Sequence, residues 1–197
     1  MKICPNFNLP ASEVKKVILE VESHTGLFLQ SGFMKYEFVH KSIQEYLAAE
    51  YIVKLPSLEY LKEKIDVMGA ELAIATSISS NPSLFFSDLV LNRFSRAKLP
   101  SSFRDAFVSR LILEKPDFYP SDDVVLSCLS LVSESLDNNL LIDFATNLIK
   151  DQGKRVVLKN YELSSIEGDF CEFKRKRRHS KFMIPNKLRL PKRVCLQ

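Results

Sequence analysis

The chain has 197 residues, 46% of them hydrophobic, which is enough for one medium domain or two small domains with an ordinary core. No run of 18 apolar residues and no secretory leader pattern occurs, so we expect a cytoplasmic protein without a transmembrane helix. The net charge of +4 is uneven, because residues 174–193 hold ten Lys or Arg and no acidic residue, and the rest of the chain is therefore acidic.

Residues 1–56 combine helix and hairpin signals. Apolar residues at helical spacing predict a first helix that begins at Ser12 as N-cap and stops at Gly26. Two β-like runs, 26–30 and 35–40, then predict a β-hairpin. The order helix, hairpin, helix is that of the latter part of a winged helix.

A second helix follows the hairpin. Ser42 and Glu45 have the spacing of a capping box, in which each side chain bonds a backbone N–H of the first turn, and Pro56 marks the end. The apolar side chains of this helix lie on a broad face, which predicts that it is well buried; they are Ile43, Tyr46, Leu47, Ala49 and Tyr51.

Residues 57–153 indicate a helical domain. Amphipathic segments alternate with short connections rich in Pro and Ser, which favours a compact multi-helix array. Pro82 stands at a favourable first helical position, and a later helix has Phe103, Ala106, Phe107 and Leu111 at helical spacing. Residues 154–197 contain β-like pieces and then a basic tail that we expect to be loosely structured. The predicted fold class is therefore mainly α, with a partial winged helix at the start.

Motifs that carry enzymatic chemistry are missing from the sequence. It contains no GxxxxGK[ST], GxGxxG, HExxH or GxSxG pattern, so we predict no catalytic residue, no metal ligand and no independent enzymatic activity. The four cysteines show no metal-binding spacing, and we expect free thiols at Cys4, Cys128, Cys171 and Cys195.

The stretch YEFVHKSIQEYLAA, residues 36–49, resembles the winged-helix signature of NACHT-type STAND ATPases. That signature has the form H-x-S-hydrophobic-Q-E-aromatic-x-A-A after an aromatic strand. The matching residues here are Phe38, His40, Ser42, Gln44, Glu45, Tyr46, Ala48 and Ala49. Only residues 26–51 match by motif; the helices up to residue 150 match the helical domain of bacterial members in kind.

The resemblance implies that His40 contacts a nucleotide and that the chain works together with an ATPase core. In that family the histidine contacts the β-phosphate of ADP and holds a closed state, and a helix start independently favours an anion. The ATPase core is absent from these 197 residues, so the chain alone would hold no cofactor, and ADP or ATP would bind only with a core supplied by a preceding segment or a partner chain. The implied function is a non-enzymatic module that relays ligand sensing or oligomerisation in antiviral (anti-phage) defence, with self-association as a further expectation.

Two alternatives stay open. In one, a winged helix and the basic tail bind nucleic acid, through Lys174, Arg175, Lys176, Arg177 and Arg178. In the other, the chain is a truncated product without independent function, whose incomplete winged helix exposes Ile43 and Leu47.

Overall fold

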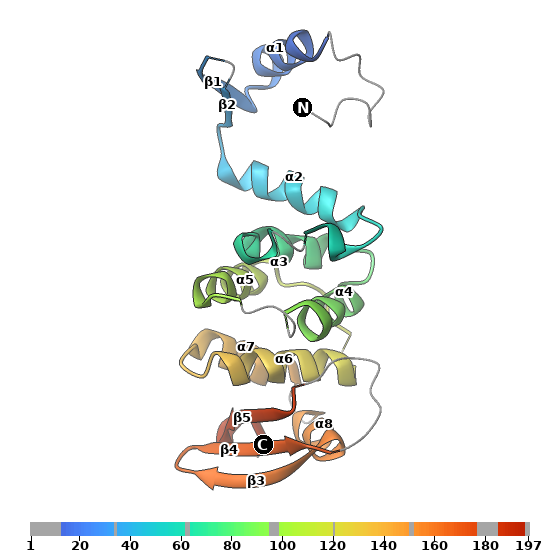
Figure 1. Cartoon of the computed structure of the whole chain (residues 1–197), viewed down its shortest axis with the longest axis vertical. Coiled ribbons are helices and arrows are strands. Elements are labelled where there is room, and N and C mark those ends of the chain that lie inside the picture. Colours follow the sequence, from blue (N-terminus) through green and yellow to red (C-terminus); the bar gives the residue numbers. More distant parts are fainter. Residues whose placement is uncertain are drawn as a thin grey trace. The chain divides into compact units, whose positions relative to one another are not determined.

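The computed structural model describes residues 13–33, 35–61, 64–94, 99–119, 121–149, 152–176 and 185–195 (Figure 1). They fall into two compact units, one within residues 1–48 and one within residues 49–197. Helices dominate, with one two-stranded and one three-stranded antiparallel sheet, so the prediction of a mainly α protein with a hairpin near its start is confirmed.

The first unit has the order helix, hairpin, helix. Helix α1 (Val14–Thr25) ends where Gly26 adopts a left-handed conformation and donates its N–H to the Glu22 carbonyl, as predicted. Ser12 lies outside the described residues. Strands β1 (Phe28–Gly32) and β2 (Lys35–Phe38) pair antiparallel, with Phe28 opposite Phe38 and their rings edge-to-face at 5.3 Å. Helix α2 (Lys41–Val53) follows, and the boundary between the units falls within it.

The second unit begins with helices that pack around phenylalanines. Two short 3₁₀ turns, η2 (Leu58–Leu61) and η3 (Ile65–Val67), precede α3 (Gly69–Ile78). Helix α4 (Pro82–Asp88) begins at the predicted proline, is capped by Asn81, and continues as the π-helical turn η4 (Leu89–Arg93). Helix α5 (Ser101–Glu114) packs against α3. Phe94 of this unit stands edge-to-face on two α5 rings, those of Phe103 and Phe107.

Helix α6 (Asp122–Glu134) is the centre of the second unit. All nine residues from Val124 to Val132 are buried, because the helix contacts α4, α7, α8 and β5 on its different sides. Helix α7 (Asn139–Ile149) packs against it through Leu141, Ile142 and Ala145. Figure 1 shows α3, α4 and α5 on one side of the α6–α7 layer and the three-stranded sheet with α8 on the other.

The C-terminal part differs from the sequence prediction. Residues 154–173 were expected to hold β-like pieces, but residues 154–160 belong to helix α8 (Gln152–Asn160), whose buried face is Gly153, Val156 and Val157. Strands β3 (Tyr161–Glu167), β4 (Phe170–Arg175) and β5 (Lys187–Pro191) then form an antiparallel sheet, followed by the short helix α9 (Lys192–Cys195).

The prediction of a loosely structured tail was therefore wrong for the described residues. Lysines and arginines alternate there with apolar residues, and a strand can point the first to solvent and the second into the core. Cys171, Phe173, Leu188 and Leu190 are all buried on the inner face of the sheet.

Candidate functional site

His40 occupies the N-cap position of α2. Its backbone carbonyl accepts the N–H of Ile43 at 3.1 Å and that of Gln44 at 3.4 Å, and its side chain is exposed. The first-turn N–H groups of a helix and an exposed imidazole can both donate to an anion. The position thus suits one contact to a phosphate, whereas a nucleotide pocket needs further groups.

The predicted capping box does not form. Because α2 begins at Lys41, Ser42 lies in the first turn and not at the cap, and its side chain is exposed. Glu45 is one turn further along and pairs with Lys41 at 3.4 Å. The spacing of Ser and Glu was correct for a box, but the helix starts one residue earlier, so that His40 takes the place expected for serine.

One face of α2 is buried and another is open. Ala49 and Ile52 are 0% and 1% exposed and belong to the core of the second unit. On the other face Leu47 is 45% exposed and Tyr51 60%. Residues four positions apart share a helix face, so Ile43, Leu47 and Tyr51 form one stripe, which we call the α2 stripe. The prediction of a well-buried helix was wrong for this stripe.

The predicted nucleic-acid residues lie at the end of β4. Lys174 and Arg175 are its last two residues and Lys176 follows, whereas Arg177 and Arg178 lie outside the described residues. Lys176 donates its backbone N–H to the Asn160 carbonyl at 2.9 Å and its ammonium group to the Leu158 carbonyl at 2.5 Å. His40 belongs to the first unit and these residues to the second.

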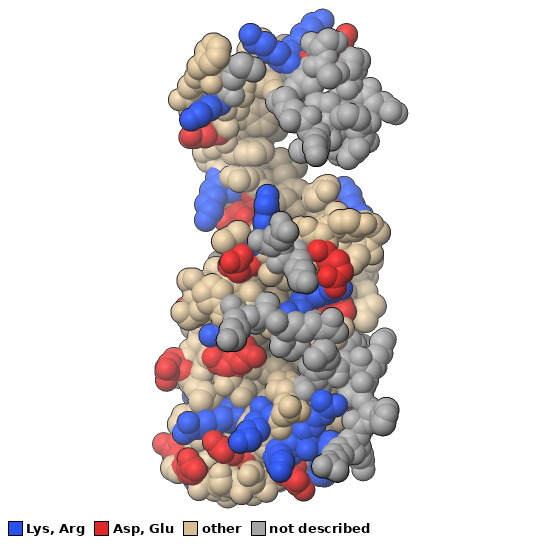
Figure 2. Space-filling model, in the orientation of Figure 1, with Lys and Arg blue, Asp and Glu red and all other residues tan. Residues whose placement is uncertain are grey.

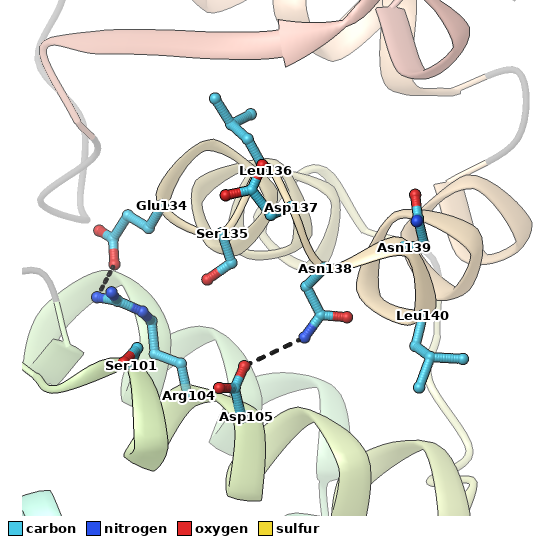
Figure 3. Close-up of a pocket in the computed structure, with 10 residues that line it drawn as sticks. All are labelled: Ser101, Arg104, Asp105, Glu134, Ser135, Leu136, Asp137, Asn138, Asn139 and Leu140. Atoms are coloured by element: carbon cyan, nitrogen blue, oxygen red, sulfur yellow. Dashed lines mark hydrogen bonds and ion pairs between the residues drawn. The ribbon is translucent and has the colours of Figure 1, made fainter.

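A polar cavity of about 530 Å³, which no sequence motif predicted, lies between α5 and the turn that joins α6 to α7 (Figure 3). Arg104 of α5 points to Glu134, with an N–O distance of 3.6 Å, and Asp105 accepts the side-chain amide of Asn138 at 3.3 Å. Burial raises the pKa of Glu134, and the nearby Arg104 opposes this shift. No local sequence pattern could predict this cavity, because its lining residues come from segments more than 25 residues apart in sequence.

The chemistry of this cavity is that of ion pairing and hydrogen bonding. Its ten described lining residues include three carboxylates and one arginine, but no cysteine or histidine. Asn138 also caps α7 by accepting the Leu141 N–H at 3.0 Å. These contacts tie α5 to the α6–α7 turn, and they account for the polar side chains as structural links.

The two cysteines that the structure describes fully, Cys128 and Cys171, are buried free thiols, in agreement with the prediction for them. Burial raises the pKa of Cys128 to about 12, so this thiol stays protonated at neutral pH and is a poor nucleophile. Cys4 lies outside the described residues.

Among the described residues, neither a candidate metal site nor a helix that could span a membrane is present. They contain no group of three or more side chains arranged to hold a metal ion. None of their helices combines the length and apolar content that crossing a membrane requires. Comparisons with protein-family models, with curated proteins and with solved structures found no match.

Proposed function

We propose that this chain is a regulatory and interaction module that works with a NACHT-type ATPase core, on the same or on another polypeptide. The observation that carries the proposal is the position of His40. The signature residue stands exposed at the N-cap of α2, directly after an antiparallel hairpin, which is where the resemblance requires a phosphate-contacting histidine. An anion at this point would meet the free N–H groups of a 13-residue helix.

The α2 stripe is the second support. Leu47 and Tyr51 lie one and two turns beyond Ile43 and remain largely exposed, although apolar and aromatic side chains of this size contribute strongly when an interface buries them. Ile43, the first residue of the stripe, lies three residues after His40, so a partner that covers this end of α2 can contact both. The α2 stripe is therefore the proposed binding surface. The proposed partner is an ATPase core that covers the stripe and completes the phosphate site.

The proposal can be tested by site-specific photo-crosslinking in the cell that naturally produces the protein. A photoreactive phenylalanine analogue replaces Tyr51 or Leu47, and the captured polypeptide is identified by mass spectrometry. We expect a protein segment with a GxxxxGK[ST] phosphate loop. The matched control places the analogue at Glu20, an exposed residue of α1, which should not capture that segment.

The nucleotide role needs its own measurement on the assembled complex. Calorimetry with ADP should show binding that His40→Ala weakens at least tenfold, since one charge-assisted contact is lost. His40→Ala should leave the complex itself intact. Capture only of proteins without a phosphate loop, or equal ADP affinity in the variant, would contradict the proposal.

A further inference from the structure

The C-terminal segment holds a large share of the positive charge. Residues 152–195 contain 13 of the 28 Lys and Arg residues but only 4 of the 24 Asp and Glu residues. Figure 2 shows Lys and Arg side chains gathered over the part of the second unit that the three-stranded sheet and α8 form, with fewer acidic groups among them. Such a concentration attracts a polyanion.

The basic residues at one end of this sheet are held on an ordered backbone. We call Lys174, Lys176 and Lys187 the basic strand end. Arg175 donates its N–H to the Asn186 carbonyl at 2.9 Å, and Lys176 donates to Asn160 and Leu158 at the end of α8. A charge run in a flexible coil is solvated and pays an entropy cost on binding, whereas the backbone of these residues is already ordered in the sheet.

Two of the cations face each other across the sheet. Lys174 of β4 lies directly opposite Lys187 of β5, and both are exposed. Like charges directly opposite on neighbouring strands repel each other. Glu162 of β3 stands on the other side of Lys174 and offsets one charge of the pair. The remaining excess is relieved when an external anion binds between the two ammonium groups.

A planar group lies further along the same outer face. Arg189, two residues after Lys187 on β5, holds its guanidinium 4.9 Å from the centre of the Phe170 ring. Glu172 is its cross-strand neighbour. A guanidinium held over an aromatic ring keeps its second face open for stacking, and unpaired nucleic-acid bases stack on such planes.

We propose that the outer face of the β3–β4–β5 sheet binds single-stranded nucleic acid. The phosphates lie at the basic strand end, and a base stacks on the Arg189 guanidinium. A single strand fits better than a duplex, because its bases are free to reach a flat sheet. This proposal uses none of the residues assigned to the ATPase partner, so it does not depend on that partner.

The test is fluorescence anisotropy of the full chain with labelled 20-mers of uridine RNA and thymidine DNA at 50–200 mM salt. Lys174→Gln/Lys187→Gln should weaken binding roughly 10- to 30-fold at 0.1 M salt and flatten the log–log salt dependence by about 1.4, since two phosphate contacts are lost. The control Lys15→Gln/Lys16→Gln, exposed residues of α1, removes the same charge and should change affinity less than about twofold.

Arg189→Lys separates stacking from charge. It keeps the cation but loses the plane, so affinity should fall with an unchanged salt dependence. Equal losses in the two lysine variants, tighter binding of a duplex, or preferential binding to anionic lipid vesicles would overturn the proposal. Absence of binding by the wild-type chain at 50 mM salt would also overturn it. If Arg189→Lys bound with unchanged affinity, the proposed stacking of a base on Arg189 would be wrong.

Discussion

Gly69, the first residue of α3, lies against the backbone of Phe103 in α5. A Cβ at Gly69 would stand 2.8 Å from the Phe103 carbonyl oxygen and 3.1 Å from the backbone nitrogen of Phe107. Both neighbours are main-chain atoms, so no side-chain rotation can make room. This close approach brings the buried rings of Phe103 and Phe107 into the core between the two helices.

Gly69→Ala should therefore destabilise the second unit. Alanine is the better helix former, but the added methyl group must push α3 away from α5, and overpacking of this kind costs about 1–3 kcal/mol. Urea unfolding followed by circular dichroism measures the loss. Gly153→Ala is the matched control in α8, where the new Cβ meets the rotatable Cδ1 of Ile149 at 2.9 Å. Its loss should be smaller; a Gly69→Ala variant as stable as wild type would contradict this account of the α3–α5 contact.

A substitution at Ser87 should stabilise the protein, in contrast to Gly69→Ala. It is 1% exposed in α4, and its hydroxyl has no hydrogen-bond partner among the described residues. A buried polar group without a partner costs free energy, and alanine removes it while favouring the helix. Ser87→Ala should raise the free energy of unfolding by about 1 kcal/mol, measured by urea titration.

Ser127→Ala serves as its comparison. Ser127 is equally buried in α6, but its hydroxyl donates to the Asp123 carbonyl at 2.7 Å. This variant should lose about 0.5–1.5 kcal/mol, because a made hydrogen bond is removed. If both serine variants lost stability, the Ser87 hydroxyl would have a partner after all.

The sequence predicted best those elements that local rules specify. The hairpin, the stop of α1 at Gly26 and the start of α4 at Pro82 all follow from the backbone preferences of single residues. The buried face of α5, with Phe103, Phe107 and Leu111, follows from helical periodicity. These signals need no knowledge of distant contacts.

The errors arose where distant segments decide the outcome. The apolar residues of α2 could not reveal which face meets the core; Ala49 and Ile52 are buried in it and Val53 packs against it. Basic and apolar residues alternate in Lys187–Pro191, which is a strand pattern. The high positive charge of this segment nevertheless led to the prediction of a loosely structured tail. The cavity beside Arg104 is lined by two segments that are far apart in sequence, so no local motif could predict it.

Asp122 should link α6 to α8 through charge. It sits in the first turn of α6 and accepts from Arg155 at 3.1 Å and from Lys159 at 2.5 Å. Exposed ion pairs contribute little singly, but two pairs and a favourable helix dipole act here together. Asp122→Asn should lower stability by about 1 kcal/mol at low salt and by less at 1 M sodium chloride. A loss that does not depend on salt would show that packing, not charge, is responsible.

Cys128 should make the protein less stable at alkaline pH. Burial raises the pKa of its thiol from an ordinary 9.0 to about 12, so above pH 9 the unfolded chain loses this proton while the folded chain keeps it. The stabilisation from the protonated thiol is complete below pH 9 and falls as pH rises toward 12. Between pH 9 and 10 the wild type should lose about 1 kcal/mol of stability from this group, following the proton linkage of about 1.4 kcal/mol per pH unit.

Cys128→Ala isolates that contribution. The smaller side chain lowers stability at every pH, because it leaves a cavity in α6, but it should flatten the decline between pH 9 and 10. Burial also raises the pKa of Tyr161, whose hydroxyl donates to the Pro185 carbonyl, but the ordinary pKa of tyrosine is 10.0, so its effect sets in about one pH unit higher. Urea unfolding at pH 8, 9 and 10 therefore reports mainly on Cys128, and the comparison with Cys128→Ala cancels the smaller contribution of Tyr161. Parallel pH profiles for wild type and Cys128→Ala would mean that the thiol ionises without cost in the folded state.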